Sequence, residues 1–99
     1  MKLIEAVIQQ LKLQEVRNAL DEIGVEEFME SAIISHGRKG QTMIFRGARY
    51  VANIVEKVKL EIIAADDSVD TIIGVIGSIA GTGKRDDCRI AIRPYLEVI

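Results

Sequence analysis

The chain is poor in several residue types, and each shortage excludes something. It has one cysteine, one proline, one histidine, no tryptophan and 4% aromatic residues among 99. The lone cysteine, Cys88, cannot form an internal disulfide and is typical of a reducing compartment, so we expect a cytoplasmic protein. The lone histidine, His36, has no carboxylate or serine at a helpful spacing, and no histidine, cysteine and carboxylate cluster has metal-ligand spacing. We therefore expect neither an enzyme nor a metal site.

Long hydrophobic runs and a strong net charge are also missing. No apolar run approaches the roughly 20 residues that a membrane-spanning helix needs, so we expect no insertion into a membrane. The formal charge of −2 gives no overall attraction to nucleic acid or to an anionic membrane, so any cationic surface must be local. What is present is a hydrophobic content of 48%, which is enough for one core. The composition predicts a single domain over residues 1–99.

Hydrophobic spacing predicts four strands and two helices. Apolar and charged residues alternate from Val58 to Ile62, which is typical of a half-buried strand. Leu13, Val16 and Leu20 recur at three- and four-residue steps, which is typical of an amphipathic helix. The expected strands are Lys2–Gln9, Glu27–Ser35, Lys57–Ala65 and Cys88–Ile92. The expected helices run from Leu13 to a C-cap at Gly24, and from Val69, after N-capping oxygens on Asp66, Asp67 and Ser68, to about Gly81.

The order of these elements predicts the fold class. Strand, helix, strand, strand, helix, strand is the α+β ferredoxin-like βαββαβ arrangement, in which two helices cover one face of a four-stranded antiparallel sheet. The opposite face of the sheet still needs cover, and three copies packed together would provide it, so we expect a homotrimer. Pro94 is expected just past the fourth strand, where the loss of a backbone donor is tolerable.

A glycine- and arginine-rich segment separates the second and third strands. His36–Tyr50 has the sequence HGRKGQTMIFRGARY, and we expect a long loop over about 36–54. A long basic loop in a compact domain is usually functional or disordered. An apolar trio at its centre suits an anchor for a partner protein. The trio is Met43, Ile44 and Phe45, and the cations around it are Arg38, Lys39, Arg46 and Arg49.

These segments together resemble the PII signal-transduction proteins over essentially the whole chain. The resemblance implies a trimeric sensor that binds ATP or ADP in clefts between subunits, and whose long loop, the T-loop, engages a target protein. Single pieces are weak signals, but the collinear series is strong. The pieces are MKLIEAVIQ, KLQEVRNALDEIG, Gly37-Arg38 with Gly40 and Thr42, Arg46-Gly47-Ala48 with Tyr50, KVKLEII, DDSVDTII and Thr82-Gly83-Lys84.

The resemblance also implies roles for particular residues. On the phosphate side, backbone NH groups beside glycine and guanidinium groups can satisfy phosphate oxygens. The implied nucleotide contacts are Val7, Ile62, Ile63 and Ala64 for adenine and ribose, and Gly37, Arg38 and Arg89 for the phosphates. The implied T-loop contacts to a partner are Met43, Ile44, Phe45, Arg46 and Arg49. Tyr50 aligns with a tyrosine that some bacterial PII proteins carry as a uridylylation site.

The sequence departs from the PII pattern at several positions. Lys39 stands where members that sense 2-oxoglutarate have a magnesium-binding glutamine, and an ammonium cannot ligate a metal. Asp86 and Asp87 replace part of the glycine-bounded phosphate loop, which disfavours a triphosphate most. The chain also stops at Ile99, before the C-terminal arginines that usually contact phosphate. These departures predict a divergent, energy-sensing branch that binds ADP, ATP or AMP without magnesium or 2-oxoglutarate. Its partner is unidentified: a membrane transporter, favoured by frequency in the family, a transcription regulator or a metabolic enzyme.

Two alternative functions stay open from the sequence. Lys57 matches the lysine that holds the oxoacid, which keeps a canonical nitrogen-status PII protein that senses ATP and 2-oxoglutarate under consideration. The second alternative is an RNA-binding ferredoxin-like module, because FRGARYV resembles the basic-aromatic strand motif of such domains. That motif precedes the third strand, and the low aromatic content leaves few rings for stacking bases, so no nucleic-acid partner is expected.

Overall fold

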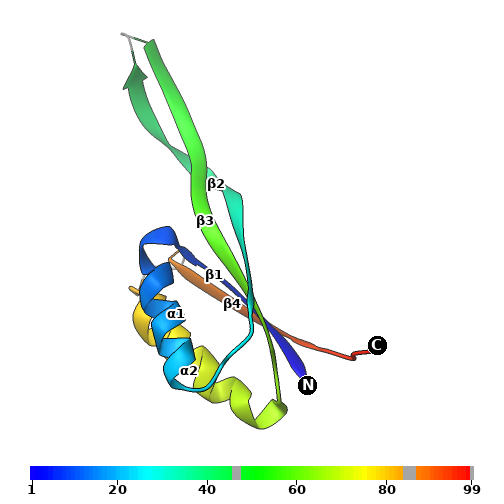
Figure 1. The fold of residues 1–99 in the computed structure, drawn as a ribbon. Coiled ribbons are helices and arrows are strands. Elements are labelled where there is room, and N and C mark those ends of the chain that lie inside the picture. Colours follow the sequence, from blue (N-terminus) through cyan, green and yellow to red (C-terminus); the bar gives the residue numbers. More distant parts are fainter. Residues whose placement is uncertain (46–47, 84–86, 99) are drawn as a thin grey trace.

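The computed structural model describes the backbone of residues 1–45, 48–83 and 87–98, and the side chains of 1–36, 54–83 and 87–98. Four strands form one antiparallel sheet in the order β2-β3-β1-β4, and the two α-helices lie side by side on one face of it (Figure 1). This arrangement confirms the predicted α+β ferredoxin-like fold. The elements are β1 Lys2–Gln9, α1 Leu13–Glu22, β2 Met29–Phe45, β3 Ala48–Ala64, α2 Val69–Ala80 and β4 Cys88–Pro94, with short 3₁₀ turns at Gln10–Lys12 and Asp66–Ser68.

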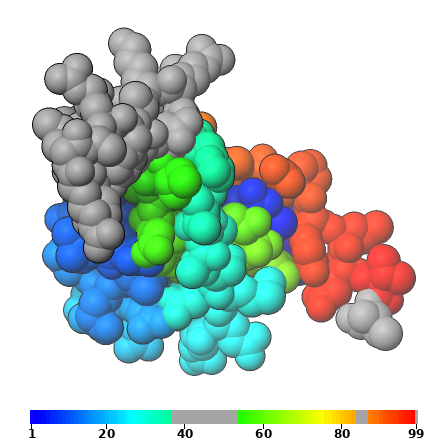
Figure 2. Space-filling model, turned by 90° about the horizontal axis from the view of Figure 1, so that it is seen from above, coloured from blue at the N-terminus to red at the C-terminus, as the bar shows by residue number. Residues whose placement is uncertain are grey.

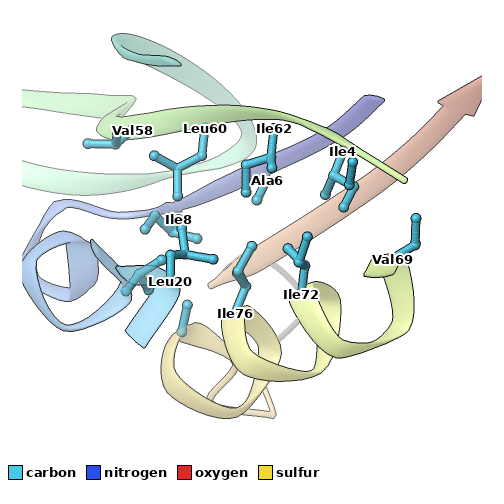
Figure 3. Packing of buried hydrophobic residues seen from close by; sticks show 13 residues of the cluster. Ile4, Ala6, Ile8, Leu20, Val58, Leu60, Ile62, Val69, Ile72 and Ile76 are labelled. Carbon is cyan, nitrogen blue, oxygen red and sulfur yellow. The ribbon is translucent and has the colours of Figure 1, made fainter. Parts of the chain in front are cut away.

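The core lies between the sheet and the two helices. Alternate residues of β1 and β3 point toward the helices, because successive side chains of a strand face opposite sides of the sheet. Figure 3 shows these residues meeting Leu20 of α1 and Ile72 and Ile76 of α2. The fully buried large side chains are Ile4, Ile8, Val16, Leu20, Leu60, Ile62 and Ile76.

Gly24 ends α1 as predicted, but it lies one residue beyond the C-cap, which is Ile23. Gly24 adopts a φ of 87°, a left-handed conformation that glycine reaches without steric cost. Its neighbour Val25 donates its backbone NH to the carbonyl of Leu20 at 2.9 Å, which closes the last turn of the helix. The chain therefore turns from α1 toward β2 where the sequence indicated.

Two expectations at element ends are wrong. No side chain caps α2: Asp66, Asp67 and Ser68 form a 3₁₀ turn instead, and Asp66 lies 3.2 Å from the amino group of Met1. The turn itself leads the chain into the helix, so the capping oxygens are not used. Pro94 is the last residue of β4, paired in register with Lys2, and does not follow the strand. A proline is tolerated there because β4 is an outer strand.

The expected loop over 36–54 is largely strand in its backbone. β2 continues to Phe45 and β3 begins at Ala48, and the two form a ribbon that extends well away from the helices (Figure 1). Pairing between the two strands overrides the turn preference of the glycines, and only Arg46 and Gly47 of this segment lie outside the described backbone. We call residues 36–54 the ribbon. It contributes to the longest dimension of the molecule, 54 Å.

The sheet face away from the helices carries a mixture of apolar and charged residues. Leu3 and Val7 of β1 are half-buried, and Ile63 of β3 is 36% exposed. On the same face, Nη1 of Arg93 lies 3.3 Å from Oε1 of Glu5. We call this the open face. Beyond β4 the C-terminal segment stands apart from the body of the molecule, coloured red in Figure 2.

Candidate functional site

The residues implied as nucleotide contacts fall into two groups on the described part of one chain. Ile62, Ile63 and Ala64 line a cavity of about 570 Å3 that is also bounded by residues 23–27, which follow α1, by the 3₁₀ turn at Asp66–Ser68 and by the first turn of α2. The side chains of Ile62 and Ala64 are 1% and 6% exposed and belong to the core. They can therefore offer a ligand only their backbone groups, whereas the side chain of Ile63 is accessible.

The second group lies across the outer strand of the sheet. Val7 of β1 is paired in register with Arg89 of β4, and both line a second hollow of about 450 Å3 together with Glu5, Cys88, Ile90 and Ala91. Arg89 is exposed, while Val7 is half-buried. Arg89 is the one cationic side chain among the described residues that line this hollow, and a guanidinium group suits an anionic ligand group.

Strand register separates the two groups along the sheet. In the pairing of β1 with β3, Leu3 lies opposite Ile63, and Val7 lies opposite Lys59. Val7 is four residues farther along β1 than Leu3, which corresponds to about 13 Å of extended chain. On one chain Val7 and Ile63 therefore line two separate hollows.

The two cavities also differ in charge. Glu26, Glu27 and Asp67 line the first cavity, so it disfavours phosphate and suits the neutral part of a ligand. The second hollow contains Arg89, and its one acidic side chain, Glu5, is engaged by Arg93. Of the two, the Arg89 end is better suited to phosphate groups, and the phosphate role implied for Arg89 stays a prediction.

One polar contact near Arg89 was not expected from the sequence. The Gln9 side-chain amide donates a hydrogen bond from Nε2 to Oδ1 of Asp87 at 2.9 Å, and joins the end of β1 to the residue before β4. Sequence spacing gave no signal for this pair, because the two residues lie at opposite ends of the chain. Asp87 itself was singled out as a carboxylate at the phosphate end, and Asp86 lies outside the described residues.

The implied contacts on the ribbon are placed in backbone only. Gly37 and Arg38 fall in the register shift between His36 and Gln41, where β2 carries extra residues relative to β3. Met43 is paired with Tyr50, Ile44 with Arg49, and Phe45 with Ala48. Arg46 lies outside the described residues, and the side chains of the other ribbon contacts are not described either. Their expected roles stay predictions.

Lys57 lies at the base of the ribbon and is 8% exposed, although it carries a charge. It is paired in register with Gln9 on β1 and with Ile33 on β2. Within the described residues, no group of three or more histidine, cysteine, aspartate or glutamate side chains could hold a metal ion. Lys39, at the position where a magnesium ligand would be needed, offers no lone pair, so the donor set does not fit the metal.

Cys88 packs against the core from β4 and is half-buried. Burial raises the pKa of its thiol above the ordinary value, because the thiolate would lose solvation. The side chain is thus a poor nucleophile at neutral pH, as expected for a structural thiol.

Comparison with known proteins decides the family. The family model described as nitrogen regulatory protein P-II matches residues 1–99. The chain belongs to the nitrogen regulatory protein P-II family. It is 40% identical to nitrogen regulatory protein P-II of Rhizobium meliloti (strain 1021), and 41% identical to that of Klebsiella oxytoca and to nitrogen regulatory protein P-II 1 of Escherichia coli (strain K12). Each alignment covers 100% of this chain and 89% of the relative.

Membership of the P-II family confirms the resemblance on which the sequence analysis relied. Proteins of this family are signal-transduction regulators, not enzymes, and they act as oligomers that interact with target proteins. None of the helices in the described part of this P-II chain is long and apolar enough to cross a membrane.

Proposed function

We propose that this P-II protein is a cytoplasmic homotrimer without catalytic activity that binds an adenine nucleotide, ADP, ATP or AMP, between neighbouring chains. Nucleotide occupancy sets the conformation of the ribbon, which controls an unidentified partner protein. The observation that carries the proposal is the division of the nucleotide contacts, with Ile63 in one cavity and Val7 and Arg89 in another. Neighbouring copies in a closed ring can join the first cavity of one chain to the second hollow of the next.

The open face supports the assembly. It carries half-buried Leu3 and Val7 and the partly exposed Ile63, which a neighbouring copy would cover. Four of the charged residues on this face form ion pairs, Arg93 with Glu5 at 3.3 Å and Lys59 with Glu61 at 3.8 Å. Burial of a paired charge is less costly than burial of an isolated one. Light scattering on the purified chain should give about three times the 11.0 kDa mass of one chain.

Calorimetry with ADP, ATP and AMP tests nucleotide binding. Arg89→Ala removes a charge-assisted hydrogen bond to phosphate, each worth about 1.5–3 kcal/mol, so affinity should fall about 10- to 150-fold. Lys12→Ala is the control, because it removes a positive charge from a residue that lines neither the first cavity nor the second hollow. Wild-type protein that binds none of the three nucleotides would refute the proposal.

The canonical alternative, a nitrogen-status sensor of ATP and 2-oxoglutarate, has two observations in its favour. The similar proteins are named nitrogen regulatory proteins, and Lys57, the residue that matches the oxoacid-binding lysine, is nearly buried at the base of the ribbon. Against it stands Lys39, which cannot ligate magnesium. Calorimetry with 2-oxoglutarate in the presence of ATP and magnesium separates the two: magnesium-dependent binding that is lost in Lys57→Met would favour the canonical function.

The partner of the ribbon is proposed by class only, as a membrane transporter, a transcription regulator or a metabolic enzyme. The apolar trio Met43, Ile44 and Phe45 with Arg46 and Arg49 is the proposed contact surface, and Tyr50 is the proposed modification site. Pull-down from lysate with wild-type protein and with a Phe45→Ser variant tests the surface, since a genuine partner should be retained only by the wild type.

A further inference from the structure

The hydrogen bond between Gln9 and Asp87 fixes a carboxylate close to the proposed phosphate contact. Gln9 follows Ile8, which is fully buried on the helix side of β1, so the side chain of Gln9 points to the open face. Its Nε2 donates a partly buried hydrogen bond of 2.9 Å to Oδ1 of Asp87. Asp87 is thereby held on the open face at the end of β4.

Arg89 lies on the same face as Asp87. Cys88 and Ile90 pack toward the core, so the residue between them points away from the helices. Two residues of extended chain separate Asp87 from Arg89, a distance of about 7 Å between their backbones. A phosphate group that contacts Arg89 therefore lies within one screening length of the Asp87 carboxylate, so the carboxylate repels it.

We propose that Asp87, positioned by Gln9, is a specificity-determining residue that selects nucleotides by the number of negative charges on their phosphates. This inference rests on the proposed function, because it concerns the same nucleotide site. Arg89 attracts any phosphate, whereas repulsion from Asp87 grows with each further charge that is brought nearby. The pair thus favours AMP and ADP over ATP. Gln9 acts through Asp87, since its amide keeps the carboxylate from turning away into solvent.

Affinity measurements across the phosphate series test the inference. Calorimetry compares AMP, ADP and ATP on wild-type protein and on Asp87→Asn, which keeps the shape of the side chain and removes its charge. We expect ATP affinity to rise about 3- to 10-fold, ADP affinity to rise less and AMP affinity to change less than about twofold, as suits one partly screened charge at this range. Asp21→Asn is the control, because it removes the same charge from an exposed position on α1.

The positioning role of Gln9 has its own readout. Gln9→Leu preserves size but cannot donate, so the ratio of ATP to AMP affinity should move toward that of Asp87→Asn. In the double variant the change in this ratio should equal that of Asp87→Asn alone, because Gln9 acts only through the carboxylate. Equal and additive effects on all three nucleotides would instead assign Gln9 a purely structural role and would overturn this part of the inference.

The outcomes separate this inference from the proposed function. If wild-type protein binds no adenine nucleotide, the proposed function fails and the inference fails with it. If wild-type protein binds nucleotides but Asp87→Asn leaves the ratio of ATP to AMP affinity unchanged, only the inference fails. Thermal unfolding of each variant identifies any loss of fold. If Asp87→Asn is unstable, Asp87→Ser provides a second substitution that removes the negative charge.

Discussion

The proposed division of the nucleotide contacts between two chains predicts that two variants, each of which binds nucleotide weakly, restore binding when they assemble together. One variant is Arg89→Ala, which removes the proposed phosphate contact. The other is Ile63→Trp, which fills the mouth of the first cavity while keeping an apolar side chain on the open face. Each variant alone should form trimers in which every cleft lacks one half of the site, so each alone should bind nucleotide weakly.

The size of the restoration follows from the geometry. In a closed ring of identical contacts, each cleft takes its Arg89 side from one chain and its Ile63 side from the next. When the two variants are mixed in equal amounts and assemble at random, half of the chains supply an intact Arg89 side and half supply an intact Ile63 side. About one quarter of the clefts then combine two intact halves and should bind with wild-type affinity.

Co-expression with two different affinity tags, followed by tandem purification, isolates the mixed trimers, in which about one third of the clefts combine two intact halves, and calorimetry measures this fraction. Native mass spectrometry gives the proportion of mixed trimers and corrects the expected stoichiometry. The control is a simple mixture of the two variants after separate assembly, which should show no restoration. Mixed trimers that bind no more nucleotide than either variant would mean that each site lies within one chain, and the reasoning from strand register would be refuted.

Four further predictions concern single side chains. Ile76→Ala should lower the free energy of unfolding by about 2–5 kcal/mol, measured in urea at fixed protein concentration, because Ile76 is fully buried; a loss below about 1 kcal/mol would contradict the described core. Arg17 pairs with Glu30 on the surface, so a double-mutant cycle should give a coupling of only about 0.2–1 kcal/mol. Alkylation of Cys88 should begin at higher pH than for a free thiol, because burial raises its pKa; an onset at or below that of cysteine itself would be inconsistent with this. Arg38→Ala should weaken nucleotide binding in calorimetry, and unchanged affinity would remove the ribbon base from the phosphate contacts.

The strands and helices were predictable because their signals are local. Buried and less buried side chains alternate in β1 and in the half of β3 near Leu60, because one face of the sheet packs on the helices and the other is open. Apolar residues recur at three- and four-residue steps in α1, because one side of the helix packs on the sheet. Gly24 marked the end of α1 because few other residues adopt its φ of 87° at low cost. In these places local preference and tertiary packing agree.

The ribbon and the second helix show where local signals are insufficient. The glycines near His36 favour a turn, yet pairing between β2 and β3 keeps the backbone extended to Phe45. Asp66 and Ser68 are good capping residues by type, but the preceding 3₁₀ turn leaves their oxygens unused at the helix. In both places an arrangement involving other parts of the chain decides the outcome, and composition does not report it.

The sequence supplies candidate site residues, but their layout on the chain needs the structure. The resemblance assigned Val7, Ile63 and Arg89 to one nucleotide site. Strand register shows that Ile63 lies apart from Val7 and Arg89 along the sheet. The contact of Gln9 with Asp87 was likewise invisible, since nothing in the sequence relates two residues so far apart. Which residues suit phosphate follows from chemical type, whereas which of them share a cavity follows from the fold.

The central place of β1 in the sheet has a consequence for synthesis of the protein. β1 is synthesised before both of its partner strands, β3 and β4. β2 and β3 are neighbours in the sequence and can pair early, whereas the four-stranded sheet is complete only after β4 has been synthesised. Until then the edge of β1 that pairs with β4 is open, and an open strand edge can pair with another chain.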